Sequence, residues 1–382
     1  MDIFHERCAG LDVHKKTVVV CIRRVGADRE IEKQTRTFGT MTADLLELLD
    51  WLKSQGVRHA AMESTGVYWK PIWHILEGAF ELILVNAHQV KRPPGRKTDV
   101  KDAEWIAELL QHGLLLPSFV PPQPIRELRD LTRQRAQLIA DKASVANRIH
   151  KTLEDANLKL AGVATDILGV SGRAMITKLI QGESDPERLA DEARASLRKK
   201  IIPLRRALAG RVTDHHRFLL RMLMDQLGQL ETLIERYTAR IEETMRPFAE
   251  AESRLMTIPG VGRQAAEVIV AEIGTDMGRF PTAGHLASWA GFCPGNNESA
   301  GKRRTGRTTK GSRWLRTALV QVAWAASHTK ETIFGASYRK WARRLGKKKA
   351  LVAVAHKILV LAYLLLKVET DYRETWKPEK AA

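Results

Sequence analysis

Apolar and polar residues alternate in short runs over the first third of the chain, which predicts strands and helices in alternation. The five apolar residues from Val18 to Ile22 have the length and β-branched character of a buried strand. Leu45, Leu48 and Leu52 recur at three- and four-residue spacings, as on one face of a helix. The predicted elements are a hairpin or meander over residues 3–38, helices over 42–55 and 65–78, strands over 57–63 and 82–85, and a helix that begins at residue 99.

This order of elements predicts the fold class of the first part of the chain. A strand meander followed by helix, strand, helix, strand and helix fits an RNase H-like α/β domain around a mixed sheet. The strand over residues 82–85 is short and apolar throughout, as expected at the centre of a sheet. Functional side chains of such folds gather outside the carboxyl ends of the strands.

Beyond residue 116 the pattern changes to long helices. Four prolines within residues 117–124 predict a linker. Leu131, Leu138 and Val145 recur every seven residues, and residues 215–248 carry a second apolar stripe. Such helices can pair as an antiparallel coiled coil within one chain or between two chains. The second stripe consists of Leu219, Met222, Leu223, Leu227, Leu230, Ile234, Tyr237, Ile241 and Met245.

We therefore expect three parts. They are an α/β domain over residues 1–116, a linker with a long-helix coiled-coil region over residues 117–250, and a mainly helical domain over residues 251–382.

A large excess of positive charge narrows the function classes. The formal net charge is +18 and the pI is about 9.9, which is typical of a protein that binds a polyanion, above all nucleic acid. The most apolar run, residues 350–366, is interrupted by His356 and Lys357, so we predict no membrane span. Charged residues precede any apolar run at the N-terminus, and the three cysteines have neither metal nor disulfide spacing. These features predict a cytoplasmic protein.

Four acidic residues lie where a sheet and a helix can bring them together. Asp12 and Glu63 each end a predicted strand. Asp99 and Asp102 are three residues apart, so both face one side of the first turn of a predicted helix. Four carboxylates predict a site for Mg²⁺, or Mn²⁺, rather than zinc. The simpler alternative for the last two acids is a solvated helix start capped by Thr98, where the helix dipole favours carboxylates.

A glycine-containing turn is the first candidate for contact with nucleic acid. The sequence I-P-G-V-G at residues 258–262 resembles the hairpin of a helix-hairpin-helix motif. Gly260 and Gly262 free backbone N–H groups to face a phosphate at the start of a helix whose dipole favours an anion. The alternative is that both glycines only turn the chain. The basic composition favours phosphate contact, which carries no sequence information.

Two basic runs without any acid follow. Residues 301–316 contain seven Lys or Arg punctuated by glycine and threonine, which predicts a loop that lies along a nucleic-acid backbone. Residues 339–349 again contain seven, and a solvated face is the alternative for either run. The candidate nucleic-acid ligands of the first run are Lys302, Arg303, Arg304, Arg307, Lys310 and Arg313.

Ser299 is a candidate nucleophile at the mouth of the first basic run. It lies in E-S-A-G, and the arginines that follow can stabilise the charged transition state of an attack on a phosphodiester. By spacing alone Ser288, Ser312 and Ser327 are rivals, and a serine in a loop is often only a turn former.

Five sequence segments in combination resemble one known family. They are G-L-D-V-H-K, M-E-S-T-G-V-Y, K-T-D-V-K-D-A, I-P-G-V-G and P-G-N-N-E-S-A-G-K, and together they resemble the IS110/IS1111 family of insertion-sequence transposases over nearly the whole chain. The N-terminal part resembles the RuvC-like DEDD domain of that family, and the part from about residue 255 to 330 resembles its C-terminal transposase domain. By position, the four acids of the family fall on Asp12, Glu63, Asp99 and Asp102, and its catalytic serine falls on Ser299.

The resemblance implies more than the residues establish. It implies a DNA recombinase of the bacterial cytosol or nucleoid that excises and inserts its element, with a serine nucleophile and a metal-bearing RuvC-like domain. It also implies a structured non-coding guide RNA, or bridge RNA, that pairs with donor and target DNA. The working form would be a homo-oligomer, a dimer or a tetramer, in which the acids of one subunit meet the serine of another.

Two rival functions remain open on the sequence. A RuvC-type Holliday-junction endonuclease would use the same acids with water as nucleophile, so Ser299 would be irrelevant. A covalent protein–DNA adduct distinguishes that rival from a transposase. A non-catalytic nucleic-acid-binding scaffold is the second rival, and the four intact acids argue against it.

Overall fold

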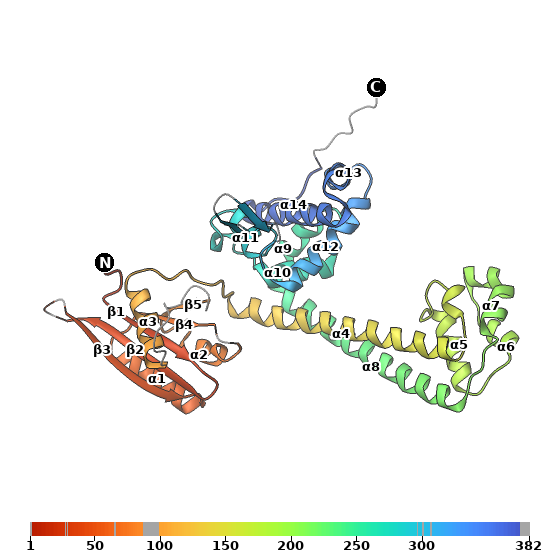
Figure 1. Cartoon of the computed structure of the whole chain (residues 1–382), viewed down its shortest axis with the longest axis horizontal. Coiled ribbons are helices and arrows are strands. Elements are labelled where there is room, and N and C mark those ends of the chain that lie inside the picture. The colour runs from red at the N-terminus through yellow and green to blue at the C-terminus, as the bar shows by residue number, and fades with distance from the viewer. Residues whose placement is uncertain are drawn as a thin grey trace, which may run out of the picture. The chain divides into compact units, whose positions relative to one another are not determined.

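The computed structural model describes residues 2–26, 28, 30–64, 66–86, 99–295, 297–299, 302–305 and 308–374, with the backbone alone at residues 99, 297–299 and 302–305. The chain forms two compact units, Met1–Val120 and Pro121–Ala382 (Figure 1). The finer division into three parts stays a prediction. The predicted Thr98 cap and almost all of the basic loop before it lie outside the described residues.

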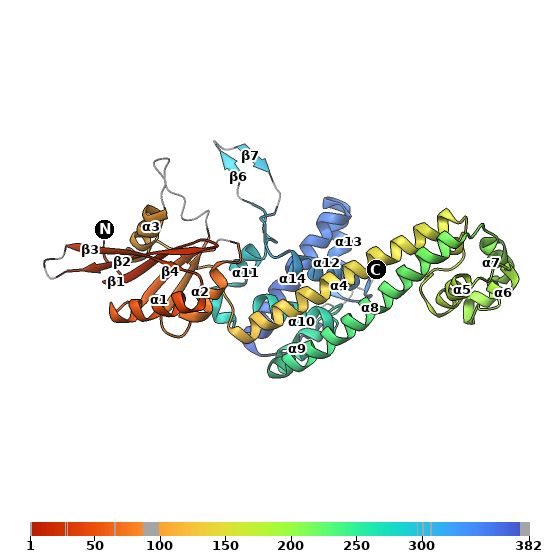
Figure 2. The ribbon, with the colours of Figure 1, turned by 90° about the horizontal axis from the view of Figure 1, so that it is seen from below.

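The first unit is a mixed five-stranded sheet with helices on both faces. Its strand order is β3-β2-β1-β4-β5, in which β1, β2 and β3 pair antiparallel and β4 and β5 run parallel to β1. Helices α1 and α2 cover one face and α3 covers the other (Figure 2). The elements are β1 (Arg7–Val13), β2 (Thr17–Val25), β3 (Ile31–Gly39), α1 (Thr42–Ser54), β4 (His59–Glu63), α2 (Trp69–Leu76), β5 (Glu81–Val85) and α3 (Asp99–Gln111). The predicted mixed sheet with helices is confirmed, but β5 lies at its edge and not at its centre as predicted.

Side chains alternate between the two faces along the central strands. Leu11 of β1 and Met62 of β4 belong to the larger core under α1 and α2. Cys8 of β1 and Ala61 of β4 pack with Ile106 of α3 on the opposite face. This period of two assigns every residue of β1 and β4 to a face.

Helix α3 lies directly on the backbone of β1 at Gly10. A Cβ atom at Gly10 would lie 2.3 Å from the nitrogen of Ala107 and 2.4 Å from the oxygen of Ala103. The buried guanidinium of Arg23 in β2 fixes the far end of the helix, because its Nε donates to Oε1 of Gln111 at 2.8 Å. A small residue on the strand thus sets the distance between helix and sheet.

The second unit is built on two long helices. Helices α4 (Gln123–Asp155) and α8 (Asp214–Met245) run side by side and antiparallel, and the shorter helices α5, α6 and α7 cover their far end (Figure 1). Of the two pairings that the sequence left open, the chain has the one within a single chain. The connecting helices are α5 (Val170–Ile180), α6 (Pro186–Ala190) and α7 (Ile201–Leu208).

The seam between the two long helices differs in part from the predicted stripes. Leu138 and Val145 of α4 are buried as predicted, whereas Leu131 is half-buried. On α8, Leu227, Ile241 and Met245 are buried as predicted, whereas Leu220 is buried outside the predicted stripe and Met222 is 44% exposed. The apolar stripe at the start of α8 is wider than the seam, so several of its members lie at the edge of the contact.

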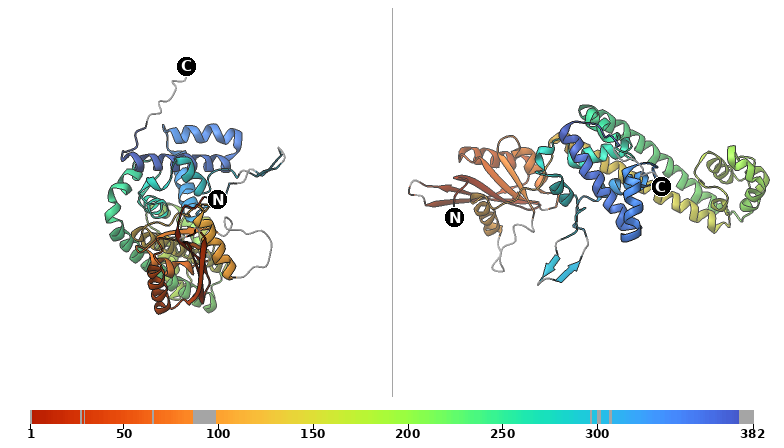
Figure 3. Two further views of the ribbon diagram at one scale, coloured as in Figure 1. Left: turned by 90° about the vertical axis from the view of Figure 1, so that its left-hand side faces the viewer. Right: turned by 90° about the horizontal axis from the view of Figure 1, so that it is seen from above.

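The remaining helices form a compact bundle at the other end of α4 and α8 (Figure 3). They are α9 (Ala249–Met256), α10 (Arg263–Ile273), α11 (Ala283–Trp289), α12 (Arg313–His328), α13 (Ile333–Leu345) and α14 (Lys347–Val368). Among the described residues, α14 alone has the length and apolar composition of a membrane span. Its apolar side chains, such as Ile358, Leu359 and Leu366, are buried against neighbouring helices, which accounts for that composition.

A buried acid ties three helices of this bundle together. Glu272 at the end of α10 is 1% exposed and accepts two hydrogen bonds from Arg133 of α4, at 2.7 and 2.9 Å. The hydroxyl of Ser312, which caps α12, donates to Glu272 at 2.8 Å. Removing one partner of a buried ion pair typically costs about 3–5 kcal/mol, so this contact holds α4, α10 and α12 in place.

The contact of α3 with β1 gives a direct test of the first unit. We expect Gly10→Ala to lower the free energy of unfolding by about 1–3 kcal/mol or more, because the added methyl group overlaps the helix backbone. Chemical denaturation measures this. Gly228→Ala is the control, because a Cβ there meets nothing within 4 Å and should leave stability equal or about 0.5–1 kcal/mol higher. Equal stability of Gly10→Ala and the unsubstituted protein would contradict the close approach.

Candidate active site and nucleic-acid interface

Asp12 and Glu63 lie next to each other at the carboxyl ends of two parallel strands. The register pairs Leu11 of β1 with Met62 of β4, and each acid follows its pair by one residue. Both acids fall on the face covered by α3, because Cys8 and Ala61 on that face are an even number of residues away. The sheet therefore brings two of the four predicted acids together.

Helix α3 runs opposite to β1, so its first turn lies at the same end. The thiol of Cys8 donates to the oxygen of Ala107 at 3.5 Å, and Gly10 faces Ala103 to Ala107. Continuing along β1 to Asp12 therefore means moving back along α3 toward its first turn. That turn carries Asp102 and begins at Asp99, whose side chain lies outside the described residues.

The carboxylate of Asp12 is nearly enclosed. The residue is 6% exposed, and its Oδ2 lies 3.1 Å from Nε2 of His14. His14 was not among the residues predicted from the sequence. Its position two residues after Asp12, on the same side of an extended chain, is the signal that predicts the contact.

The donor chemistry of this face fits a divalent cation. Asp12, Glu63 and Asp102 offer carboxylate oxygens, which Mg²⁺ and Mn²⁺ prefer. Among the side chains that the structure describes, no three His, Cys, Asp or Glu form a group that could hold a metal ion. Since Asp99 is outside that set, the four-acid site stays a prediction.

The segment that carries Ser299 is a β-hairpin and not the predicted loop. Strands β6 (Asn297–Ser299) and β7 (Lys302–Thr305) pair antiparallel, and they stand away from the helices of their own unit (Figures 2 and 3). Ser299 is paired with Lys302, directly beside the turn. The composition of this basic segment predicts an irregular loop. Backbone hydrogen bonds between the two strands order it instead. Arg307 lies outside the described residues, and Lys310 is exposed beyond the hairpin.

Two glycines and one arginine close the base of the hairpin. A Cβ at Gly311 would lie 2.2 Å from the oxygen of Ala290, and one at Gly291 would lie 2.7 Å from the nitrogen of Gly311. Arg316 of α12 donates to the oxygen of Gly291 at 2.8 Å and to the hydroxyl of Thr308 at 3.0 Å. We call these residues the hairpin neck. The neck was not predicted from the sequence, because its partners are distant along the chain.

Two of the three rival serines have structural roles. The hydroxyl of Ser312 caps α12 and bonds Glu272. Ser327 is 5% exposed, and its hydroxyl donates to the oxygen of Trp324 at 2.7 Å. Ser288 is exposed on α11. Of the three rivals, Ser288 alone is exposed, and the side chain of Ser299 lies outside the described residues.

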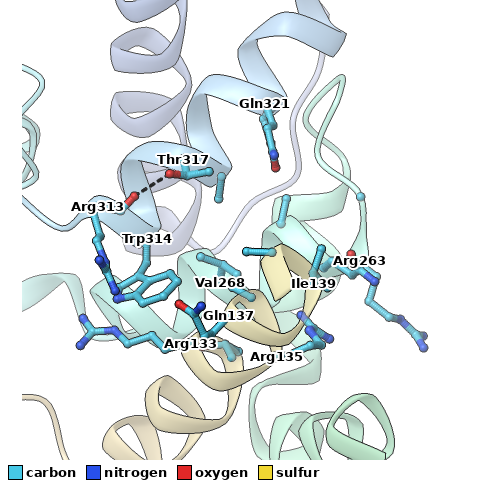
Figure 4. A pocket seen from close by; sticks show the side chains of 18 of the residues that line it. Arg133, Arg135, Gln137, Ile139, Arg263, Val268, Arg313, Trp314, Thr317 and Gln321 are labelled. Carbon is cyan, nitrogen blue, oxygen red and sulfur yellow. Dashed lines mark hydrogen bonds between the residues drawn. The ribbon is translucent and has the colours of Figure 1, made fainter. Parts of the chain in front are cut away.

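Three of the predicted nucleic-acid ligands line one cleft. A cleft of about 920 Å³ lies between α4, α10 and α12, and Gly260, Gly262 and Arg313 belong to its lining (Figure 4). Arg133, Arg135 and Arg263 also line it, and they pair with Glu272, Glu267 and Glu242 respectively. The guanidinium of Arg313 lies 4.3 Å from the ring centroid of Trp314, a cation–π arrangement.

The two cleft positions, 260 and 262, differ in whether packing requires a glycine there. Gly260 has a φ of +87°, and a Cβ there would lie 2.8 Å from the nitrogen of Ala326 and 2.9 Å from the oxygen of Val322 in α12. Packing alone therefore requires a glycine at Gly260. Gly262 precedes α10 as its N-cap and has nothing within 4 Å of a built Cβ. Its surroundings leave room for a ligand at the positive end of the helix dipole, and the phosphate contact stays a prediction.

Two parts of the chain match models of known protein families. A model for the DEDD domain of IS110 transposases, described as a transposase, matches residues 9–157. A second model, described as transposase of the IS116/IS110/IS902 family, matches residues 252–339. Together the two models cover more than half of the chain. The chain belongs to the IS110 family of transposases.

Individual relatives agree with this assignment. The chain is 27% identical to an insertion element IS116 protein of Streptomyces clavuligerus over 271 residues, which is 62% of the chain and 65% of that protein. It is 26% identical to an insertion element IS110 protein of Streptomyces coelicolor over 301 residues, which is 73% of each chain. A pilin gene-inverting protein of Moraxella bovis is 30% identical over 122 residues, which is 30% of the chain and 36% of that protein.

The family and the enzyme class predicted from the sequence are therefore confirmed. The IS110-family assignment implies DNA as the substrate. The name of the N-terminal family model refers to its D-E-D-D acids, and domains of that type generally use divalent metals. The identity of the metal, the nucleophile, the guide RNA and the oligomer are finer claims than these matches carry.

The second prediction concerns the hairpin neck of this IS110-family protein. In Gly311→Ala the new methyl group overlaps the oxygen of Ala290, so the hairpin must change its direction. Since a displacement of about 1 Å in an active site can cost about 10²-fold in rate, we expect a loss of that order in DNA strand cleavage. Gly284→Ala is the control, because its nearest neighbour is 3.5 Å away. An unchanged cleavage rate in Gly311→Ala would mean that the neck does not position the hairpin.

Proposed function

We propose that this chain excises and inserts an insertion element by cleaving and rejoining DNA strands, with Ser299 as the nucleophile. The observation that carries the proposal is the backbone pairing of Ser299 with Lys302 beside the turn of the basic hairpin. A serine at that position lies on a strand outside the helical bundle, and its cross-strand partner Lys302 is a cation. This arrangement suits a nucleophile that must reach a phosphodiester of a large substrate.

The proposed chemistry proceeds through a phosphoserine link. The Oγ atom of Ser299 attacks phosphorus, the bond between phosphorus and one bridging oxygen breaks, and the serine proton passes to water while the leaving oxygen takes up a proton. A hydroxyl of the second DNA strand then attacks the same phosphorus and releases Ser299. Lys302, Arg303, Arg304 and Arg307 would hold the phosphate and offset its developing charge.

The acids of the first unit would hold the divalent metal. Asp12, Glu63, Asp99 and Asp102 are the proposed ligands, and Mg²⁺ is the first choice with Mn²⁺ as the alternative. When bound, the metal would neutralise the scissile phosphate and orient the attack. Asp12 is held by its contact with His14 and by its nearly buried position, so its carboxylate needs little ordering to bind.

The cleft and the hairpin would share the binding of DNA. Gly260, Gly262, Lys310 and Arg313 are proposed as phosphate ligands outside the reacting centre. Their contacts position the backbone and carry no sequence information. Sequence choice would then come from base pairing with a structured bridge RNA, as the family resemblance implies.

The proposed working form is a homo-oligomer, a dimer or a tetramer, in the bacterial cytoplasm or nucleoid. The long helices α4 and α8 pair within one chain, so their shared seam is not available to join subunits. Contacts between subunits would therefore use other surfaces.

Trapping with a nicked DNA substrate tests the nucleophile. We expect a protein–DNA adduct that survives denaturant, and we expect Ser299→Ala to abolish it and to lower strand cleavage by more than about 10³-fold. Ser288→Ala is the matched control, because Ser288 is exposed and nearby in sequence. It should form the adduct normally.

Two outcomes would contradict the proposed nucleophile. Cleavage by Ser299→Ala at the unsubstituted rate would mean that water attacks, as in a RuvC-type endonuclease. Adduct formation that is lost in Ser288→Ala and kept in Ser299→Ala would assign the other serine.

A further inference from the structure

A second concave surface lies beside the hairpin neck in the same unit. The groove has a volume of about 1190 Å³ and lies between the base of the hairpin, α13 and α14. Its apolar lining includes Phe292 and Pro294 from the base of the hairpin, Trp341 and Leu345 from α13, and Val352 and Val360 from α14. No residue of this groove belongs to the acids, the serine or the cleft described above.

The charge of this groove has one sign. Arg316, Lys348, Lys349 and Lys357 belong to its lining, and among the described residues that line it there is no Asp or Glu. Lys348 and Lys349 are exposed in the first turn of α14, which contains no acid. Cations are disfavoured at the positive end of a helix dipole, so an anionic ligand would relieve an existing repulsion.

The floor of the groove carries apolar surface. Trp341, Val352 and Val360 are half-buried, so their side chains leave surface that a ligand can cover. Burial lowers the pKa of His356, so its ring is neutral at physiological pH. Aromatic and aliphatic surface beside a cationic rim is the combination that binds unpaired nucleotides, by stacking of the base and by phosphate contacts. A duplex keeps its bases inside and would leave this floor uncovered.

We propose that this groove binds an unpaired segment of the DNA strand that is handled at Ser299, with a base on Trp341 and phosphates on Lys348 and Lys349. The choice of DNA rests on the proposed function. The groove is continuous with the hairpin, because Pro294 and Thr308 pair at the hairpin base and both line the groove. Five residues of chain from Pro294 to Ser299 span at most about 18 Å, which a strand of a few nucleotides can cover.

A native cysteine makes the groove directly observable. Cys293 lines the groove and is half-exposed, whereas Cys8 and Cys21 are fully buried. Burial raises the pKa of Cys8 to about 12 and also raises the pKa of Cys21. A maleimide at neutral pH should therefore label Cys293 first in the folded protein, because the thiolate is the reactive form.

The test measures labelling of Cys293 and DNA affinity in the full chain carrying Ser299→Ala, so that no cleavage takes place. The ligands are a 12-nucleotide single strand of DNA, the same sequence as a duplex, and the same sequence as RNA. We expect the single strand of DNA to slow labelling strongly, and the duplex and the RNA to slow it much less.

Matched variants separate stacking from charge. Trp341→Ala should weaken binding of the single strand by about 5- to 100-fold, and Trp341→Phe should retain most of the affinity. Trp324→Ala is the control, since Trp324 is 59% exposed on α12 and outside the groove. Lys348→Ala with Lys349→Ala should reduce the slope of log K against log salt by about 1.4. Arg198→Ala with Lys199→Ala, an exposed pair elsewhere in the unit, should not change it.

Several results would overturn the proposal. Unchanged labelling of Cys293 at saturating single-stranded DNA would mean that the strand does not enter the groove. Equal or better protection by duplex or by RNA would assign the groove to a different ligand. Equal affinity in Trp341→Ala, with its melting temperature unchanged, would exclude stacking. These binding results do not depend on whether Ser299 forms an adduct, so this proposal and the proposed function can fail separately.

Discussion

The direct contact of a helix with the backbone of a central strand is the constraint on which the first unit depends. Because Gly10 has no side chain, α3 lies against β1 closely enough for its first turn to reach the carboxyl end of the sheet face. Asp12 and Glu63 arrive at that end through the parallel register of β1 and β4. A larger residue at Gly10 would lift the helix, and with it Asp102, away from the two strand acids.

In the second unit, packed helices hold the base of an extended hairpin. The bonds of Glu272 to Arg133 and to the α12 cap fix α12 relative to α4 and α10. Arg316 of the same helix then holds the hairpin neck. The position of the hairpin therefore depends on helix packing through a short chain of polar contacts, while the strands themselves stand free of the bundle.

How much the sequence could predict depends on the range of the interactions. Asp12 and Glu63 were predictable, because an acid at the end of an apolar strand falls at a known place in an α/β sheet. The neck was not, because the close contact of Gly291 with Gly311 joins two legs on either side of a hairpin. The basic run was predicted as a loop because of its charge and its glycines. Its strand pairing depends on residues 297–299, which lie outside the basic run. Leu219 and Met222 belong to the apolar stripe of α8, but the contact of α8 with α4 is narrower than that stripe, so the sequence could not show which members are buried.

In the proposed reaction of this IS110-family protein, the first unit supplies the acids and the second unit supplies Ser299. Mixing two inactive proteins, Asp12→Asn and Ser299→Ala, tests this division most directly. If the acids of one subunit serve the serine of another, the mixture should recover DNA recombination that neither protein has alone. A mixture as inactive as its components, under conditions in which both proteins fold and associate, would contradict a site composed between subunits.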